Sequence, residues 1–207
     1  MAESAEDLYA RIVAEHGTEP RLPMTPAQTW DVFPWEVLDG EMVPKVLPAP
    51  LVREAPRSGD PGGEDCSTCA GESGPLGPLL WENDAWTIRP MPRGGLPLVL
   101  MLEPKEHLDY TDLSDDQAGE LGRLSMWTTR IMERLDGVGR VHVMRIGDGA
   151  AHLHIWLIAR PERFSTILGS FAIEYDDMLP KTPEDSWLAD QRTVALKLAQ
   201  HDGRSLV

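Results

Sequence analysis

The stretch AHLHIWLIARP, residues 151–161, places two histidines two positions apart at the start of an apolar run. Side chains of a β-strand alternate between its two faces. If residues 152–160 form a strand, one face carries an apolar row that fits a core beneath a helix. The other face, which then looks toward a cleft, a metal ion or solvent, carries His152, His154, Trp156 and Ile158. A single strand histidine is usually structural, but two on one face indicate a functional site.

The segments around this stretch predict an antiparallel sheet with one main helix. Residues 140–146 (RVHVMRI) read as a second strand, joined to the first by the turn Gly147-Asp148-Gly149 in a hairpin. Residues 86–90 and 96–104 are further β-like runs bounded by Pro and Gly. Residues 114–135 read as a helix that begins with the capping box Ser114/Gln117. Its apolar residues recur at helical spacing: Ala118, Leu121, Leu124, Thr128, Ile131 and Leu135. The fold class predicted is α+β.

The Pro and Gly content and the pattern of apolar residues divide the chain into three regions. Residues 1–65 hold an N-terminal helix (residues 3–16) and a Pro/Gly-rich arm that we expect to pack on the core through Trp30, Phe33 and Trp35. Residues 54–64 are expected to be its loosest part. Residues 66–160 form the core domain, and residues 161–207 form a C-terminal extension with an amphipathic helix over 184–200.

The composition restricts the function classes. The chain has 207 residues and a formal net charge of −15, which repels phosphate backbones at long range and argues against nucleic-acid binding. A small phosphorylated ligand in a local basic pocket is still possible. No apolar run approaches the roughly 20 residues of a membrane helix, and the acidic start does not resemble a secretory signal. We therefore expect a cytoplasmic protein that binds no membrane.

The two cysteines stand close together in CSTC, as Cys66 and Cys69. A C-x₂-C pair suits one edge of a tetrahedral Zn²⁺ site. The alternative is a redox pair, which requires a strand-to-helix turn, but here a Gly/Pro-rich loop follows. Because no other cysteine exists, further ligands must come from the six histidines. His107 stands in an ordered loop position between a strand and the capped helix, which suits a ligand.

Taken together, these residues resemble the histidine-triad (HIT) superfamily. The resemblance rests on four motifs in order: CSTC, EPKEH at the end of a predicted strand, LDYTDLS at the start of the predicted helix, and HLHIWLI. It covers roughly residues 66–160. The zinc pattern is similar to galactose-1-phosphate uridylyltransferase and to zinc-bearing bacterial HIT hydrolases. The resemblance implies a structural zinc ion held by Cys66, Cys69, His107 and His152.

The resemblance also implies a nucleotide-processing enzyme, a nucleotidyl hydrolase or transferase. His154 matches the middle histidine of the family motif, which attacks the α-phosphorus and forms a nucleotidyl-histidine. The expected ligand is a small phosphorylated molecule or nucleotide, and relatives of this fold often form homodimers. Three positions depart from the family: Trp156 occupies the third motif position, Gly149 stands where Ser or Thr is common, and residues 144–146 hold no amide where the family has an asparagine. Indole has one N–H donor and no titrating proton, so Trp156 cannot act as an acid.

Positive groups near the predicted cleft are candidate phosphate ligands. Arg145 and Arg160 lie on the two hairpin strands, and both have the alternative of being exposed charges with local carboxylate partners. Trp156 and the Gly149 backbone complete the predicted substrate site. The acidic pair Asp176-Asp177 reads as a solvated turn before Pro180. Two other functions stay open: a non-catalytic, zinc-stabilised nucleotide-binding protein, and a HIT scaffold repurposed for another reaction.

Overall fold

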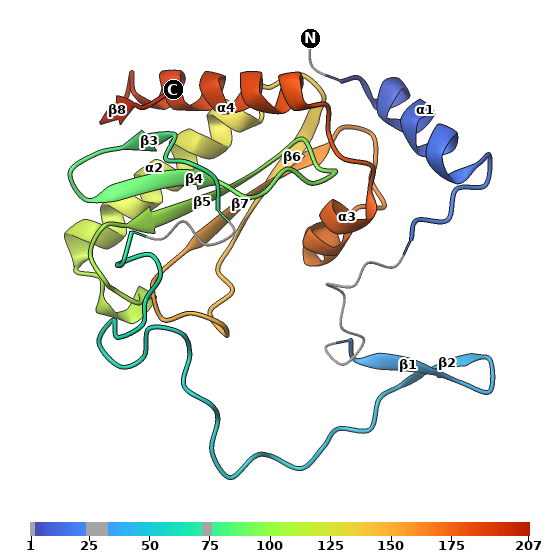
Figure 1. The fold of residues 1–207 in the computed structure, drawn as a ribbon, viewed down its shortest axis with the longest axis horizontal. Helices are drawn as coiled ribbons and strands as arrows, with labels where there is room; N and C mark the ends of the chain where they lie inside the picture. The colour runs from blue at the N-terminus through green and yellow to red at the C-terminus, as the bar shows by residue number, and fades with distance from the viewer. Residues whose placement is uncertain (1–2, 24–32, 72–75) are drawn as a thin grey trace.

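An antiparallel sheet of six strands forms the centre of the molecule (Figure 1). The computed structural model describes residues 3–23, 33–71 and 76–207; Trp30 lies outside these ranges. The strand order is β6-β7-β5-β4-β3-β8. The strands are β3 (Trp81–Glu82), β4 (Trp86–Pro90), β5 (Leu98–Pro104), β6 (Val138–Met144), β7 (Ile155–Pro161) and β8 (Arg204–Ser205). Among the described residues, no helix has the length and apolar character needed to cross a membrane.

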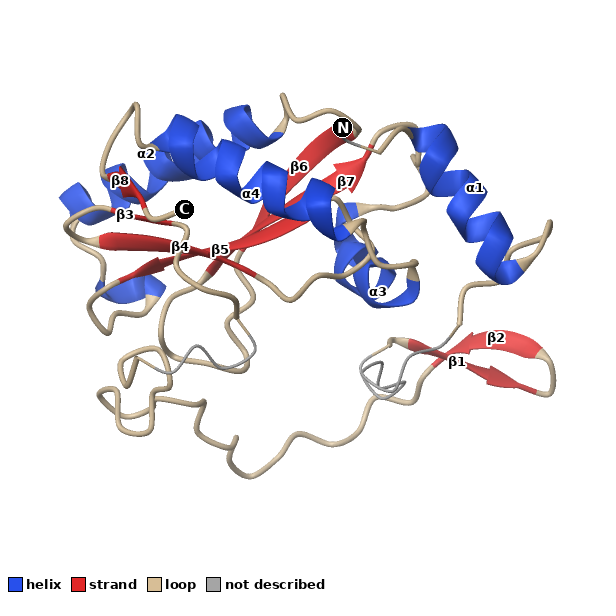
Figure 2. Ribbon diagram, turned by 45° about the horizontal axis from the view of Figure 1, so that its top comes forward, coloured by secondary structure: helices blue, strands red, loops and turns tan. Residues whose placement is uncertain are grey.

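One face of the sheet packs against two helices, α2 (Asp115–Met132) and α4 (Glu184–Leu198) (Figure 2). The predicted capping box at the start of α2 is present, because the Ser114 side chain accepts from the Gln117 N–H and the Gln117 side chain accepts from the Ser114 N–H. Of the apolar positions predicted for this helix, Ala118 is exposed. The others are buried, and the apolar ones share a core with Leu153 and with alternate residues of the central strands, among them Leu100, Leu102, Ile155 and Leu157.

The opposite face of the sheet is covered in part by α1 (Ala5–His16) and α3 (Ala172–Met178). Val99 and Ile158 of the central strands meet Leu8 and Ile12 of α1 in a second apolar cluster. The prediction of a solvated turn at Asp176-Asp177 is wrong for Asp176. Its carboxylate accepts a hydrogen bond of 2.7 Å from the Leu96 N–H and packs against Gly94. The α+β class is confirmed, with the N- and C-terminal segments completing this second face.

The hairpin of β6 and β7 forms as predicted, but its strands start and end elsewhere. β7 pairs with β6 from Met144↔Trp156 to Val138↔Pro161, and with β5 from Leu102↔Ile155 to Leu98↔Ala159. Both histidines therefore precede the strand, and the prediction that they belong to it is wrong. Residues 145–154 form a long loop instead of a tight turn, because the Leu153 N–H donates to the Leu108 carbonyl, outside the ladder.

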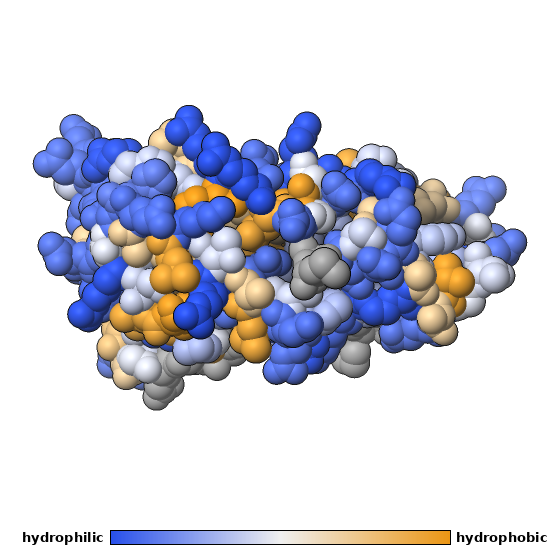
Figure 3. Space-filling model, turned by 90° about the horizontal axis from the view of Figure 1, so that it is seen from above, coloured by the Kyte–Doolittle hydropathy of each residue, from blue (hydrophilic) through white to orange (hydrophobic). Residues whose placement is uncertain are grey.

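The arm before the core has two differently packed parts. The hairpin of β1 (Trp35–Leu38) and β2 (Glu41–Pro44) exposes apolar side chains, and Phe33 and Trp35 stack with Phe171 at its base. Residues 57–66, by contrast, are bonded to the core, so the expectation that residues 54–64 are the loosest part is wrong. Figure 3 shows hydrophilic residues over most of one face, in keeping with the acidic composition.

Asp176 predicts a measurable pH dependence of stability. Burial of its carboxyl group raises its pKa from 3.8 to about 6, although the Leu96 N–H opposes this. Because the folded-state pKa is the higher one, the contribution to stability is complete below about pH 4 and is lost as the pH rises through about 6. Asp176→Asn should therefore gain about 2 kcal/mol over wild type between pH 4 and pH 8. Urea unfolding at several pH values checks this, with the exposed loop variant Asp148→Asn as control; parallel curves for wild type and Asp176→Asn would contradict it.

Candidate functional site

Two cysteines and two histidines converge at the end of the sheet. The ligand atoms of Cys66, Cys69, His107 and His152 all lie within 4.8 Å of one another. Cys66 and Cys69 directly follow the arm, His107 lies in the loop after β5, and His152 lies in the loop before β7. The structure thus brings together the four residues that the sequence predicted as ligands, and they form a candidate metal site.

The distances in this cluster suit one tetrahedral ion. Cys69 Sγ lies 3.4 Å from His107 Nδ1 and 3.5 Å from His152 Nδ1, and Cys66 Sγ lies 3.6 Å from His152 Nδ1. In a tetrahedral site with metal–sulfur bonds of about 2.3 Å and metal–nitrogen bonds of about 2.0 Å, sulfur and nitrogen lie about 3.5 Å apart. The donor atoms therefore have the separations that such an ion needs.

The tautomer of His152 is fixed by the backbone. Its Nε2 lies 2.9 Å from the carbonyl oxygen of Pro104. Since a carbonyl only accepts, Nε2 carries the proton and Nδ1 is left with a lone pair toward the cysteines. Burial lowers the pKa of His152, which also favours the neutral ring that binds metals.

Glycines of the arm hold the second histidine ligand. A Cβ atom on Gly59 would lie 3.0 Å from the His107 ring, and one on Gly63 would lie 3.1 Å from it. Both glycines have positive φ values of 83° and 89°, a conformation that larger residues rarely adopt. The arm therefore closes on His107 only because these two positions lack side chains.

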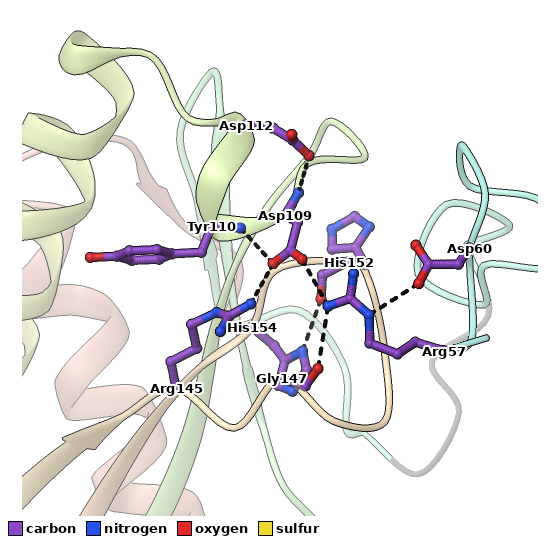
Figure 4. Close-up of polar contacts among 9 residues, drawn as sticks. All are labelled: Arg57, Asp60, Asp109, Tyr110, Asp112, Arg145, Gly147, His152 and His154. Atoms are coloured by element: carbon purple, nitrogen blue, oxygen red, sulfur yellow. Dashed lines mark hydrogen bonds and ion pairs between the residues drawn. The ribbon is translucent and has the colours of Figure 1, made fainter. Parts of the chain in front are cut away.

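His154 is held in one tautomer as well. Its Nδ1 lies 2.9 Å from the backbone carbonyl of His152, and Figure 4 shows the two rings pointing in different directions. Nδ1 must donate this bond, so Nε2 keeps its lone pair. The ring is only partly buried. His154 is therefore a side chain held in a fixed orientation that is still partly accessible to solvent.

Two arginines and one aspartate form an ion network next to the histidines (Figure 4). Asp109 accepts bonds of 2.7 Å from Arg57 and from Arg145, and Arg145 also lies over the Tyr110 ring. Although burial alone would raise the pKa of Asp109, hydrogen bonds from the two guanidinium groups and from a backbone N–H lower it to about 2. Asp109 is therefore ionised at neutral pH and fixes both arginines.

Arg57 connects the arm to the loop that precedes the histidines. Besides Asp109, it donates to Asp60 at 3.0 Å and to the Gly147 carbonyl at 3.2 Å. The next residue, Ser58, forms a parallel β-bridge with Ala150, in which the Ser58 N–H donates to the Gly149 carbonyl. The arm thus adds one short strand to the loop at 147–151.

The remaining predicted site residues fall in different places. Gly149 lies in the exposed part of this loop, and Arg145 is paired with Asp109. Trp156 lies in β7 and packs against the second apolar cluster. Arg160 does not join the site: six residues at about 3.3 Å each separate it from His154, a distance of about 20 Å. Arg160 lies opposite Arg140 toward the other end of β7, and a substrate-binding role for it stays a prediction.

Arg57 and Asp109 are site residues that sequence reasoning missed. Asp109 follows His107 by two positions and begins the 3-10 turn Tyr110–Asp112, where its side chain acts as a cap. The local sequence LDYTDLS contains that signal. Arg57 gives no local signal, because its partners at 109 and 147 come close only in the folded chain.

The Arg57 contacts predict a local opening when they are removed. Arg57→Ala should speed hydrogen exchange of the Ser58 and Ala151 amides several-fold, because both bond across the bridge that Arg57 holds. Arg53→Ala, an exposed position of the same arm, is the control and should leave both rates unchanged. Exchange measured by NMR or mass spectrometry decides, and equal rates in wild type and Arg57→Ala would show that the bridge does not need this side chain.

Comparisons with known proteins concern the fold. No family model matches the chain, and no curated protein matches it. Among solved structures, a Zn-bound histidine triad family protein from Mycobacterium smegmatis is 15% identical, with a TM-score of 0.46, over 66% of this chain and 92% of its own. A histidine triad nucleotide-binding protein from Sulfolobus tokodaii is 16% identical, with a TM-score of 0.48, over 65% and 93%.

A third similar structure is a uridylyltransferase, 19% identical with a TM-score of 0.44. The match covers 65% of this chain and 44% of that one. These solved proteins are the kinds that the sequence pattern resembles. All three likenesses have TM-scores under 0.5 and identities under 20%.

Proposed function

We propose that the protein is a nucleotide-processing enzyme that transfers a nucleotidyl group through His154, to water as a hydrolase or to a second phosphate as a transferase. The observation that carries the proposal is the tautomer of His154. Because Nδ1 donates to the His152 carbonyl, Nε2 is the nitrogen with a free lone pair, which a nucleophilic imidazole requires. Nε2 attacks the α-phosphorus, the bond to the leaving group breaks, and an incoming water or phosphate later displaces the histidine.

The ion network supports a site for a phosphorylated ligand. Arg145 is a bidentate donor with its side chain about one-third exposed (37%), and phosphate oxygens are the acceptors that such a fork suits. Asp109 neutralises part of the charge of Arg145. A phosphate must therefore either displace Asp109 from Arg145 or bind to the N–H groups of Arg145 that Asp109 leaves free. In a chain of net charge −15, such a local pair of arginines is the basic feature that an anion can use.

We further propose that the four-residue cluster holds Zn²⁺. Two thiolates and two imidazoles are donors that zinc prefers, whereas calcium and magnesium prefer oxygen. All four positions of a tetrahedron are filled by protein, so the ion would be structural and would tie the arm to the loop carrying His154. A cytoplasmic location and a homodimer stay predictions.

A second candidate function is binding without turnover. It is favoured by Trp156, whose indole nitrogen is buried and has no hydrogen-bond partner among the described residues. A side chain that packs in an apolar cluster gives no acid at the third motif position. A scaffold repurposed for another reaction has the same support, and the nucleotidyl adduct distinguishes both alternatives from the enzyme.

His154 predicts a covalent adduct. Wild type mixed with nucleoside 5′-phosphoramidates or nucleoside diphosphate sugars and quenched within milliseconds should gain the mass of one nucleoside monophosphate. His154→Ala should give no adduct, while His142→Ala, a histidine of β6 outside the site, should retain it. Intact mass spectrometry is the measurement. The enzyme proposal fails if wild type forms no adduct with any donor and His154→Ala binds nucleoside monophosphates as tightly as wild type.

The metal cluster predicts one equivalent of zinc. Metal analysis after dialysis should give about one zinc per chain in wild type and in Ser67→Ala, which lies on the same turn but offers no ligand. Cys66→Ser and His107→Ala should lose most of it and should unfold at lower temperature, because zinc binding contributes to folding free energy. Undiminished zinc in either variant would refute the ligand assignment.

A further inference from the structure

One charged side chain lies inside the most buried strand of the sheet. All seven residues of β5 are buried, and Glu103 is its only charged member. Leu98, Leu100 and Leu102 point to the helix-covered face, so the alternation of the strand places Glu103 on the opposite face. This is the face on which Trp156 packs.

The register of the sheet brings Glu103 next to the proposed nucleophile. The pairing of β5 with β7 includes Met101↔Trp156 and ends at Leu102↔Ile155. His154 immediately precedes β7, so continuing this register by one step places Glu103 opposite His154 at the end of the ladder. Cross-strand neighbours have Cβ atoms about 4.5–5.5 Å apart within a ladder. Arg89 from the neighbouring strand β4, and then His154 when its ring is protonated, lower the pKa of the Glu103 carboxyl group, which places both side chains near it.

Glu103 is buried, and in the described part of the chain one of its carboxyl oxygens is unpaired. The residue is 4% exposed, and its Oε2 has no hydrogen-bond partner among the described residues. Burying a carboxyl group without partners costs free energy, and such groups gather at functional sites. Burial raises the pKa of Glu103, although Arg89 and then His154 oppose this.

We propose that Glu103 is the proton donor to the leaving group in the transfer through His154. The proposal rests on the proposed function and supplies what the third motif position lacks, since Trp156 has no proton to transfer. A carboxyl group one register step from the nucleophile, shielded from water and with an oxygen left unbonded, is suited to this role.

In the first step, His154 Nε2 forms a bond to the α-phosphorus, and the bond from phosphorus to the leaving oxygen or nitrogen breaks. The leaving atom takes the proton of Glu103. This leaves a Glu103 carboxylate beside a cationic nucleotidyl-imidazole, and the opposite charges stabilise one another. In the second step water attacks the phosphorus and gives its proton to Glu103, and His154 departs as a neutral imidazole.

Leaving-group dependence tests the proposal. Two probes are adenosine 5′-(phenyl phosphate), whose leaving phenolate needs a proton, and adenosine 5′-(4-nitrophenyl phosphate), whose leaving group departs as a stable anion. In single-turnover experiments, Glu103→Gln should slow release of phenol roughly 100-fold or more, as loss of a general acid does, and release of nitrophenol less than about 5-fold. Glu106→Gln, in the loop that follows the strand, is the matched control and should slow neither.

The outcomes separate the two proposals. Equal losses on both esters, or no loss on either, overturn the role of Glu103 while the proposed function stands. Absence of release from both esters by wild type overturns the proposed function and the proton donor with it. If Glu103→Gln does not fold, wild type still decides: the ratio of phenol release to nitrophenol release should fall as the pH rises, because only the phenyl ester needs the protonated carboxyl. A ratio that stays flat with pH overturns the role.

Discussion

The hydrogen bond between the His152 ring and the Pro104 carbonyl is the contact on which the site depends. It joins the last residue of β5 to the loop before β7 and leaves Nδ1 of the ring toward the two cysteines. The same loop then offers the His152 carbonyl to His154. One backbone acceptor therefore fixes a metal ligand directly and the proposed nucleophile indirectly. A change in the end of β5 would alter both.

The arm belongs to the site because it carries groups that the core lacks. It supplies the glycines that pack on His107 and Arg57, which bonds to Asp109, and it leads directly into the two cysteines of the cluster. Gly59 and Gly63 pack on His107, and Arg57 bonds to Asp109 and Gly147. These contacts hold the loop after β5 and the loop before β7 in place. Removing residues 1–65 would take away the packing on His107 and one side of the ion network. The chain before residue 66 is thus part of the functional unit and not only a linker to it.

Local patterns predicted the elements, and long-range contacts decided what they could not predict. The capping box at Ser114 and the apolar spacing of the following helix depend on neighbours within one or two turns, so the sequence was sufficient for α2. The cysteine pair of the candidate metal site was predictable because only two cysteines exist, whereas the choice of His107 and His152 among six histidines followed from the resemblance to the histidine-triad superfamily. The start of β7, however, depends on Leu108 accepting a bond from Leu153, and no local pattern contains that contact.

The same limit applies to charged residues. Arg160 has a side chain that suits a phosphate ligand, but it lies near the far end of β7 from His154. Arg57 lies in a stretch rich in Pro and Gly that reads as loose, and its partners are 52 and 90 residues away. The role of an ionisable side chain depends on which distant groups the fold brings to it, whereas its sequence context gives only its neighbours.

Asp176 and Glu103 show how burial alone fails to identify a functional carboxyl group. Burial raises the pKa of both. Asp176 accepts the Leu96 N–H and packs closely on Gly94, so it fastens α3 to the sheet and the fold explains it. Glu103 lies in an otherwise apolar strand and leaves one oxygen unbonded, and a leucine at this position would complete the apolar strand without that cost. The proposed reaction at His154 needs an acid that Trp156 cannot supply, and Glu103 is the buried carboxyl group next to it in the register. The contrast between a satisfied and an unsatisfied buried carboxyl, and not the pKa of either, is what assigns Glu103 to the reaction.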